Sequence, residues 1–570
     1  MNAASPAWRL AAADDDAVQR LAAELGAPPP IARMLVARGW TTPEIARQAL
    51  APDYRLPPPE VLSGMAGAAQ VVARAVRARR RIAVYGDFDA DGVTAAALLC
   101  RWLRGAGADV VPFLPQRLAD GYGLTVPTVD RCLRTLQPDL VVTVDCGTHS
   151  DGAVRHVLER GVDIVVTDHH LAVAPSQVAP TAMVNPQLGP ADGPGRELAG
   201  VGVALQLVRA IAQVLGRDDP ADDPAILELA AIGTVADCVP LRGTNRTLVR
   251  RALSRMVSDS ALPGLRALRA VAKVGEIRDT WPLAFLLAPR LNAAGRLGTA
   301  EDALELLLTD NADRAQVLAG HLDRENRRRQ EMEERILEAA SAQLDEQPAT
   351  EREFGVVVAD PSWHPGVVGI VAGKLVARHR RPAVVIVLRP DGGGRGSCRG
   401  LESLDLTAIL ADCAGCLESW GGHAMAAGLD LAAGRLDDFR RAFNAAVCRH
   451  AGGALPPQQL SYDALLPLGD ADVDLWDWIE RAGPYGHGYP PPLWAAERLE
   501  ILDWRVAKAR HVLMRVRQGQ VYRRAVAFQQ AHCPRPQGPT DFLFELQINK
   551  WTGVRHPELR VAAWRSSPPG

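Results

Sequence analysis

The stretch Val84-Tyr-Gly-Asp-Phe-Asp-Ala-Asp-Gly92 places carboxylates at every second position, Asp87, Asp89 and Asp91, directly after a short apolar run. The run at 82–85 is β-favouring and predicts a buried strand, and the Ala- and Leu-rich segment 93–103 predicts a helix. The carboxylates are therefore expected at a strand-to-helix turn. In an open parallel sheet such turns lie at the carboxyl ends of the strands, where ligands bind, and carboxylates packed this closely need a cation to offset their repulsion.

Two other interpretations of this turn compete with a metal site. The pattern Asp-x-Asp-x-Asp-Gly also opens an EF-hand calcium loop, but that loop needs a bidentate Glu at its twelfth position, where this chain has Leu98. A strand is also expected before the turn, where an EF-hand has a helix. The second alternative is a solvated acidic turn. The choice between a metal site and these alternatives depends on whether distant segments supply further metal ligands.

The composition limits the class of protein. A chain of 570 residues exceeds what one hydrophobic core usually supports, so we expect about two to four domains. Because 64 basic residues balance 66 acidic ones, any nucleic-acid surface must be local. Nine cysteines without framework spacing indicate reduced thiols, and for Cys413 and Cys416, which form a CxxC pair, packing is favoured over a zinc or redox role. No signal peptide or membrane span is expected, which predicts a cytoplasmic protein without a membrane partner.

Strands and helices are expected to alternate after a helical leader at 1–65, which contains helical patches at 31–38 and 43–50. Apolar, β-favouring runs predict a parallel sheet from strands at 82–85, 110–114, 140–144, 164–167 and 183–184.

Metal-type ligands follow three of these predicted strands. The run 140–144 leads into Asp145-Cys-Gly147, and the run 164–167 leads into Asp168-His-His170. If the strands are neighbours, these residues converge with the first turn on one edge of the sheet, and Asp237 is positioned to join them. The full set is Asp87, Asp89, Asp91, Asp145, His169 and Asp237.

A carboxylate-rich set with one imidazole favours manganese or magnesium over zinc. Six ligands are too many for one ion with open positions. Two ions about 3.5–4 Å apart with a bridging carboxylate fit better, and they would clamp the attacking and leaving oxygens of a phosphoryl displacement.

In this order, the segments 87–92, 144–147 and 168–170 resemble the DHH phosphoesterase superfamily. Asp120-Gly-Tyr-Gly123, Asn185-Pro186, Asp237 and the segment 289–296 extend the resemblance to the bacterial single-strand-specific exonucleases of that superfamily, over nearly all the chain past the leader. Phe88 stands where the family often has Tyr, which puts nothing catalytic in doubt because this is a packing position.

The resemblance implies roles for individual residues. Asp89, Asp91, Asp145, His169 and Asp237 would be direct metal ligands, with Asp145 bridging. Asp87 and Asp168 would be either ligands or acids that orient the ligands, and His170 would face the scissile phosphate. The substrate-binding residues would be Arg117, Tyr122, Arg290, Asn292, Arg296, Arg395, Ser397, Arg399 and His423.

The second half of the chain predicts a helix, a second α/β domain and a barrel. Arg290, Asn292 and Arg296 are expected in a Gly/Ala-rich loop, with a surface salt bridge as the alternative role, and 311–345 predicts a long, solvated connecting helix. Strands at 355–359 and 383–388 and a helix at 367–378 follow. The period-two spacing of 395, 397 and 399 suits phosphate recognition by two guanidiniums around a hydroxyl, and the glycines at 421 and 422 would let His423 approach the same ligand.

A local basic field is expected near the carboxyl end. The segment 505–540 contains eight Lys/Arg and no Asp or Glu. Predicted strands at 512–517, 521–528, 542–548 and 559–564 favour a small barrel of OB type that binds single strands. Tyr522, Phe528 and Trp551 are candidates for base stacking, although a core position is the more common role for each aromatic.

We therefore expect an α/β protein with a parallel-sheet DHH domain (66–310), a connecting helix (311–350), a second, DHH-associated α/β domain (351–452) and an OB-type β-barrel (456–570). The expected function is two-metal hydrolysis of single-stranded DNA. DNA over RNA, the 5′→3′ direction, release of nucleoside 5′-monophosphates, and single-strand DNA-binding protein and a helicase as partners come only from the resemblance, and a monomer is expected. One alternative is a DHH small-nucleotide phosphodiesterase or phosphatase, which would not need the basic domain. The other is a non-catalytic DNA-binding scaffold, which would tolerate the loss of ligands.

Overall fold

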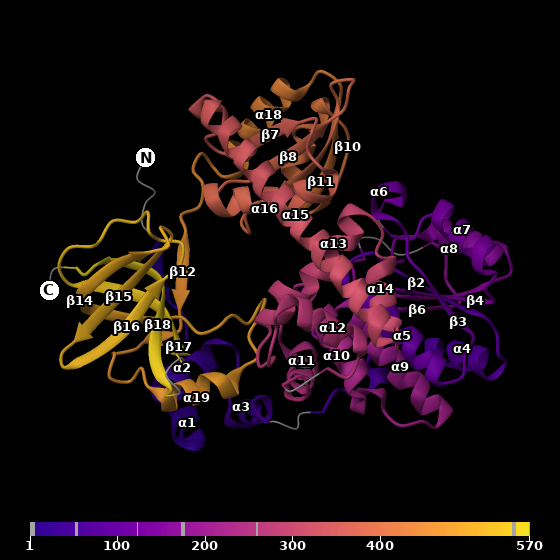
Figure 1. Ribbon diagram of the computed structural model, residues 1–570, viewed down its shortest axis with the longest axis horizontal. Coiled ribbons are helices and arrows are strands. Elements are labelled where there is room, and N and C mark those ends of the chain that lie inside the picture. Colours follow the sequence, from indigo (N-terminus) through magenta and orange to yellow (C-terminus); the bar gives the residue numbers. More distant parts are fainter. Residues whose placement is uncertain are drawn as a thin grey trace.

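The computed structural model describes residues 6–51, 55–121, 123–172, 177–257, 260–549 and 554–568. Figure 1 shows a first α/β domain (α4–α14), a second α/β domain (β7–α18) and a β-barrel (β13–β18), with the long helix α15 running from the first domain to the second. In the described part of the chain, no helix is long and apolar enough to cross a membrane.

The first domain is built on a five-stranded, fully parallel sheet in the order β3-β2-β4-β5-β6. The strands are β2 (Ile82–Gly86), β3 (Val110–Phe113), β4 (Leu140–Val144), β5 (Asp163–Thr167) and β6 (Ala182–Val184). This confirms the predicted sheet. Alternate residues of each strand enter two different cores, so both faces are buried and the strands are apolar throughout, as parallel sheets require.

Helices cover both faces of this sheet. One core joins the sheet to α4 (Met65–Arg77), α5 (Ala90–Gly105), α9 (Gly200–Leu215) and α10 (Pro224–Ala236), and the other joins it to α7 (Val126–Leu136) and α8 (Asp151–Glu159). From β2 the chain crosses to β3 on one side, while β4 lies on the other side. The carboxyl ends of β2 and β4 therefore flank the point where the strand order reverses, which is where open α/β sheets bind ligands.

The first domain has further helices besides those on the sheet. They are α6 (Arg117–Asp120), α11 (Gly243–Arg255), α12 (Pro263–Ala272), the π-helix η4 (Leu283–Leu287), α13 (Ala288–Leu297) and α14 (Glu301–Leu308). The short 3-10 turns are η1 (Pro59–Val61), η2 (Pro186–Leu188), η3 (Pro220–Asp222), η5 (Ala349–Glu351) and η6 (Ala414–Cys416).

The segment with Arg290, Asn292 and Arg296 is the helix α13, so the predicted loop is wrong. Pro289, which has no N–H, follows directly after the π-helix η4, where the backbone hydrogen-bond pattern of the helix changes, so the helix continues through it. The small residues serve close packing, because a Cβ on Gly295 would lie 2.6 Å from the carbonyl oxygen of Phe88.

The connecting helix α15 (Ala312–Glu346) has 35 residues and is about 52 Å long. The predicted long connecting helix is present, but the expectation that it is solvated is wrong for one face, on which Asp323, Asn326 and Glu333 are buried. Glu333 is ion-paired with Arg329 of the same helix and with Lys374 of the second domain. The charged pattern therefore includes pairs that fix the helix to its neighbours.

The second domain has a mixed sheet in the order β10-β11-β9-β8-β7, in which β7 and β8 are parallel and the other pairs are antiparallel. Its elements are β7 (Val356–Asp360), α16 (Pro365–His379), β8 (Ala383–Leu388), β9 (Gly394–Arg399), α17 (Leu406–Ala411), β10 (Leu417–His423), β11 (Ala426–Leu431) and α18 (Leu436–His450). Cys413 and Cys416 are buried in the apolar core of this domain, as the packing interpretation requires.

The carboxyl-terminal part is a closed five-stranded barrel, as predicted, since β14 pairs with β17 and completes the order β14-β15-β16-β18-β17. Its elements are β12 (Gln459–Tyr462), β13 (Ala464–Leu465), α19 (Val473–Ala482), β14 (Trp494–Ala507), β15 (His511–Gln518), β16 (Val521–Ala527), β17 (Thr540–Asn549) and β18 (His556–Ser566).

The leader packs against the barrel. Its helices are α1 (Asp15–Leu25), α2 (Pro29–Ala37) and α3 (Pro43–Leu50), and their apolar residues share one core with the barrel strands. The leader also contains a strand, β1 (Ala7–Leu10), which the sequence did not predict because its parallel partner, β12, lies some 450 residues further along the chain.

One buried arginine ties the leader, the first domain and the barrel segment together. Arg246 of α11 donates hydrogen bonds to the carbonyl oxygens of Ala49, Ala482 and Gly483, each 2.7 Å long. Its guanidinium lies 5.0 Å from the ring centre of Trp40 and 5.6 Å from that of Tyr489. The cation therefore replaces its lost water by three carbonyl groups and two aromatic faces.

Candidate active site

The turn after β2 is folded by its own carboxylates. Asp89 caps α5, because its Oδ1 accepts hydrogen bonds from the amides of Asp91 (3.0 Å) and Gly92 (3.1 Å). Gly92 is required here, since a Cβ would lie 2.6 Å from the backbone of Asp87. Asp87 is buried, and its Oδ2 has no hydrogen-bond partner among the described residues.

The start of helix α9 holds the third carboxylate of the turn. Asp91 accepts hydrogen bonds from the amides of Gly200 (2.6 Å) and Val201 (2.8 Å). These amides belong to the first turn of the helix, where N–H groups have no partner within the helix and the dipole favours a negative charge. Asp91 is thereby fixed with its carboxylate toward the carboxyl ends of the strands.

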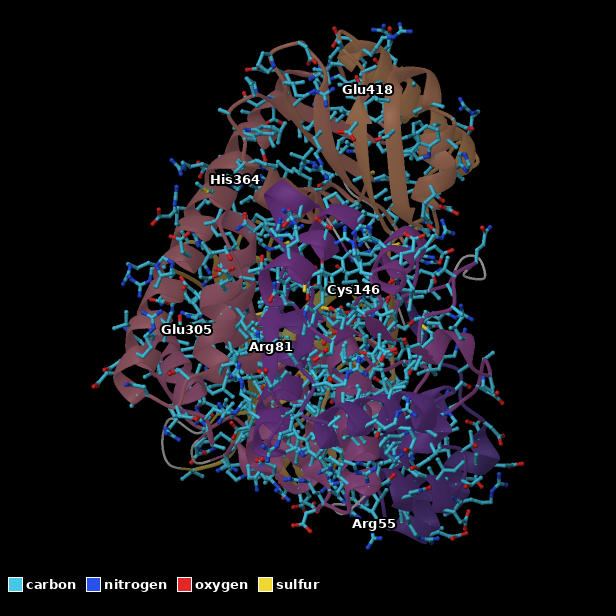
Figure 2. All side chains as sticks on the ribbon, turned by 90° about the vertical axis from the view of Figure 1, so that its right-hand side faces the viewer. Arg55, Arg81, Cys146, Glu305, His364 and Glu418 are labelled. Atoms are coloured by element: carbon cyan, nitrogen blue, oxygen red, sulfur yellow. The ribbon has the colours of Figure 1, made fainter. Side chains whose placement is uncertain are left out.

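Asp145 follows β4 in the left-handed backbone region, with φ of 63°, which Asp tolerates better than most residues. Its side chain packs against Gly200, where a Cβ would lie 2.6 Å from the Asp145 Cβ. Asp145 Oδ1 is buried without a hydrogen-bond partner in the described structure. In Figure 2 the labelled Cys146, which directly follows Asp145, lies well inside the outline of the molecule, below the second domain.

His169 joins the carboxylates from three different elements. Its Nε2 lies 3.0 Å from Asp145 Oδ1, 3.6 Å from Asp237 Oδ2 and 3.9 Å from Asp91 Oδ2. Asp237 ends α10, so the helix that packs on α5 brings it to this edge. The predicted metal ligands therefore converge on the edge where β2, β4 and β5 end.

These side chains form sets suited to two cations. The ligand atoms of Asp91, His169 and Asp237 lie within 4.8 Å of one another, and so do those of Asp87, Asp89 and Asp145. The two sets share no residue, and Asp145 and His169 connect them. Asp87 Oδ2, Asp145 Oδ1 and His169 Nε2 are buried and make no hydrogen bond within the described structure, although the last two lie 3.0 Å apart. Because buried polar atoms without a hydrogen bond are costly, divalent cations are a fitting partner for all three.

The pKa shifts of these residues indicate a site that a cation would stabilise. Burial, followed by repulsion from neighbouring carboxylates, raises the pKa of Asp91 to about 7 and that of Asp237 to about 9, and it raises the pKa of Asp145 well above its usual range. Burial, with the nearby His170, lowers the pKa of His169 to about 4. A neutral imidazole and deprotonated carboxylates are the forms that bind a metal, so a cation would stabilise them.

Asp168 orients its neighbours. Its Oδ1 lies 2.7 Å from His170 Nδ1 and accepts from the amide of His169 (2.7 Å), and its Oδ2 accepts from the amide of Thr148 (2.9 Å). Burial would raise the pKa of Asp168, but the hydrogen bonds from His170 and Thr148 outweigh it and hold the pKa below its usual range. The same contact with Asp168 raises the pKa of His170 against the effect of burial.

Three arginines lie near the carboxylates of the acidic turn. We call Arg117, Arg296 and Arg399 the arginine cluster. Burial, together with repulsion from Arg117, Arg329 and Arg399, lowers the pKa of Arg296 to about 10. Burial, with repulsion from Arg117, also lowers the pKa of Arg399. Three guanidiniums that repel one another beside an acidic centre provide a site for a phosphate, which would relieve the repulsion.

The second domain contacts the arginine cluster. Arg296 Nη1 donates to the carbonyl oxygen of Gly366, at the start of α16. A Cβ on Gly369 would lie 3.3 Å from Arg399 Nη2 and 3.4 Å from Ser397 Oγ. The first turns of α16 and strand β9 therefore meet at the arginine cluster. Arg395 is exposed on the same strand.

The remaining predicted residues have other positions. Arg290 is ion-paired with Asp323 of α15 (2.8 Å), and this largely buried pair fixes α13 to α15. The Oδ1 of Asn292 accepts from the amide of Ala90 (2.8 Å), which places Asn292 against the acidic turn. His423 is exposed at the end of β10, and Tyr122 lies outside the described residues.

The sequence analysis missed the amides of Gly200 and Val201, which hold Asp91. It named Asn185 only as part of the family resemblance, and the structure shows that Asn185 donates to Thr148 Oγ1 (2.8 Å) and to the carbonyl oxygen of His170 (2.9 Å). A signal existed for the first pair, because two glycines, Gly200 and Gly202, open a strongly apolar helix.

The barrel carries less uncompensated charge than the sequence suggested. Arg517 is ion-paired with Glu500, while Arg515 is cross-strand partner to Asp503 and Arg524 to Glu558. The local basic field is therefore interleaved with acids from neighbouring strands.

Two of the predicted stacking aromatics lie on the surface. Tyr522 is 50% exposed and Phe528 is 46% exposed, so the core interpretation is wrong for both. Arg560 lies over the ring of Phe528 at 5.7 Å. Trp551 lies outside the described residues.

Three family models match the chain. The DHH family, N-terminal domain, matches residues 81–234, the DHHA1 domain matches 353–448, and the RecJ OB domain matches 462–563.

Curated relatives and a solved structure match most of the chain. A single-stranded-DNA-specific exonuclease RecJ of Bacillus subtilis is 32% identical over 98% of this chain and 71% of its own length, and that of Escherichia coli is 35% identical over 88% of both. A crystal structure of RecJ from Thermus thermophilus in complex with Mn²⁺ has a TM-score of 0.83 and 33% identity, and it covers 99% of this chain and 80% of its own. A second structure of that protein contains Mg²⁺ and has a TM-score of 0.78. With this coverage and this arrangement of domains, the chain belongs to the RecJ family.

Proposed function

We propose that the protein is a metal-dependent exonuclease that hydrolyses single-stranded DNA. The observation that carries the proposal is the meeting of two ligand sets, joined through Asp145 and His169, with the arginine cluster near them. The choice of DNA rests on the names of the relatives, which are called single-stranded-DNA-specific exonucleases.

Each side chain has a place in this chemistry. One ion would be held by Asp91, His169 and Asp237, and the other by Asp87, Asp89 and Asp145. When bound, manganese or magnesium ions neutralise the carboxylates and stabilise the phosphodiester oxygens that gain negative charge.

The protein's own groups position the substrate. The arginine cluster binds phosphate oxygens, and the first turns of α16 lie beside it. His170, held by Asp168 through Nδ1, has a raised pKa, which favours the imidazolium form. In that form its Nε2 donates a hydrogen bond to a phosphate oxygen, which suits a residue that faces the scissile group.

The finer parts of the proposal come from family resemblance. They are a 5′→3′ direction, release of nucleoside 5′-monophosphates, a role in DNA repair and recombination in the cytoplasm, action as a monomer without membrane attachment, and single-strand DNA-binding protein and a helicase as partners. The arginine cluster would then hold the phosphate nearest the 5′ end. Arg395 and His423, on the same sheet as Arg399, are proposed to contact the strand further out.

One experiment tests the proposal directly. Matched DNA and RNA oligonucleotides, labelled at either end, are incubated with the protein and manganese or magnesium, and the products are sized over time. Immediate release of mononucleotides from the 5′ end of DNA is the expected result. Hydrolysis of dinucleotides without attack on long strands would assign the site to a small-nucleotide phosphodiesterase, and salt-sensitive strand binding without turnover would assign the protein to the scaffolds.

A further inference from the structure

Two neighbouring aromatic side chains are exposed on the first domain and take no part in the metal centre. Phe285 is 63% exposed, the largest value among the exposed large apolar side chains of the described residues, and Trp281 is 54% exposed. Their ring centres lie 5.6 Å apart, with an angle of 33° between the rings. Exposed apolar groups that gather in this way mark binding surfaces more often than isolated ones do.

The aromatic pair lies on the same helical segment as two residues of the active site. Residues 281–297 are helical without a break, first through the π-helix η4 and then through α13. Trp281, Phe285, Pro289, Asn292 and Arg296 follow one another at intervals of three or four residues, and none of them is buried. This spacing places them along one face of the helix.

That face leads from the metal centre outward. Asn292 contacts the acidic turn, and Arg296 belongs to the arginine cluster. At the rise of a helix, Phe285 lies about 10 Å from Asn292 along the axis, and Trp281 lies one turn beyond. A strand whose phosphate is held by Arg296 therefore has an aromatic surface within reach of its next nucleotides.

The far end of this face approaches the barrel segment. Thr280 donates a hydrogen bond to the carbonyl oxygen of Tyr485, and the amide of Leu241 donates to that of His487 (2.7 Å). Residues 485–487 lie in the connection between α19 and the first barrel strand β14, which Figure 1 shows reaching the helices α11 and α12 of the first domain. Trp281 thus lies between the metal centre and the segment that carries the barrel.

We propose that Trp281 and Phe285 form a stacking site for nucleobases of the single strand, on the path between the arginine cluster and the barrel. The inference rests on the proposed function and extends it with a second contact on the catalytic domain itself. Aromatic rings stack on any base, so the site holds the strand without reading its sequence.

A nucleobase suits this patch better than a protein partner does. Two aromatic side chains offer about 150–250 Å² each, well below the roughly 800 Å² per partner of a stable protein interface. The same helical face also continues to Arg296 of the arginine cluster. A strand lying along this face would place its bases on the aromatic pair and a phosphate at Arg296.

The test replaces each ring by an aliphatic side chain, in Trp281→Leu and Phe285→Leu. Val317→Ala, which trims an exposed apolar residue on α15, is the control. Stacking on one aromatic is worth about 1–3 kcal/mol per base, so each leucine variant is expected to raise KM for a long strand by about 10-fold with kcat unchanged. Cleavage of a dinucleotide, which is too short to reach the pair, should be unaffected. An equal loss of dinucleotide cleavage would instead show that the rings support the site, and would overturn the proposal.

A second measurement does not depend on cleavage. Affinity for strands with a single abasic position is measured by fluorescence anisotropy in EDTA, for the full-length protein and both variants. We expect an abasic site at one or two positions of the strand to weaken binding by about 10-fold in the original protein. The same abasic site should have little effect in the leucine variants, because the ring and the base lose the same contact. If an abasic position weakens binding equally in the original protein and in both variants, stacking is refuted. Stacking is also refuted if the original protein self-associates and the leucine variants do not. If strands bind in this pattern but are never cleaved, the stacking site stands and the exonuclease proposal falls.

Discussion

Replacing Asp145 by asparagine removes one negative charge from the metal centre and leaves its backbone undisturbed. Asparagine is chosen because Asp145 has φ of 63°, a conformation that Asn adopts readily and that would strain alanine. The side-chain volume is also kept, which matters because Gly200 packs directly against the Asp145 Cβ. Any change in stability then reports on charge.

Without metal, the variant should be more stable than the original protein. The ligand atoms of Asp87, Asp89 and Asp145 lie within 4.8 Å of one another. Two full charges at that distance repel by about 3 kcal/mol at an effective dielectric constant of about 20. Partial protonation already relieves some of this repulsion, so we expect the free energy of unfolding in EDTA to rise by about 1–3 kcal/mol.

With metal, the order should reverse. A ligand at 100 times its dissociation constant stabilises the folded state by about 2.7 kcal/mol. The original protein should gain this from manganese, whereas the asparagine variant, having lost the carboxylate that connects the two ligand sets, should gain less than about 1 kcal/mol. Urea denaturation in EDTA and in manganese measures both effects. A variant that is less stable in EDTA, or that gains as much from manganese, would refute the idea of a charge cluster built for cations.

The same variant separates catalysis from binding. Cleavage of single-stranded DNA should fall by at least about 100-fold, because an outer-sphere contact alone is commonly worth 10–100-fold. Strand affinity in EDTA should not fall, since the arginine cluster and the barrel are untouched. Parallel loss of cleavage and binding would contradict the assignment of Asp145 to the metals.

Other substitutions and conditions test the surrounding structure. Gly200→Ala should lower activity by about 10-fold or more, because its Cβ would lie 2.6 Å from that of Asp145, whereas Gly67→Ala on α4, where nothing lies within 4 Å, should leave kcat/KM unchanged. Arg246→Met should lower the free energy of unfolding by about 2–4 kcal/mol in urea denaturation, since three carbonyl groups lose their donor; an unchanged midpoint would refute its role as a tie between the parts. In EDTA, the free energy of unfolding should fall between about pH 4 and pH 7, by up to about 4 kcal/mol from Asp91 alone. The pKa of Asp91 is raised to about 7 in the folded state, so the folded protein binds this proton more tightly than the unfolded chain does. The stability that comes from this tighter binding is lost as the pH rises. Saturating manganese should abolish this decline, and urea midpoints at several pH values measure it.

The local structure of the first domain could be predicted because its signals are local. Five apolar, β-favouring runs separated by helical segments indicate a parallel sheet without further information, and all five strands formed there. The acidic turn was also predictable, since a strand that ends in alternating carboxylates before a helix leaves few other positions for them. Most of the candidate ligand set followed from one topological rule, that parallel strands end on the same edge, whereas Asp237 comes from the end of helix α10.

Side-chain partners could not be predicted in the same way. Arg290 and Arg296 look equivalent in the sequence, but Arg290 is paired with Asp323 on another helix while Arg296 faces the active site. The basic segment 505–540 meets its acids only when the strands pair, because Glu500 and Glu558 lie on neighbouring strands outside that segment.

The sequence by itself determined the elements, the order of the domains and the type of metal centre. Hydrophobic period and strand-end chemistry are properties of contiguous residues, and they survive any later packing. Only the tertiary structure decided which amides hold Asp91, which arginines remain available for a phosphate, and that the leader shares the barrel's core. Each of these depends on contacts between segments far apart in the chain, and such contacts are set by how the whole molecule buries its apolar surface and pairs its charges.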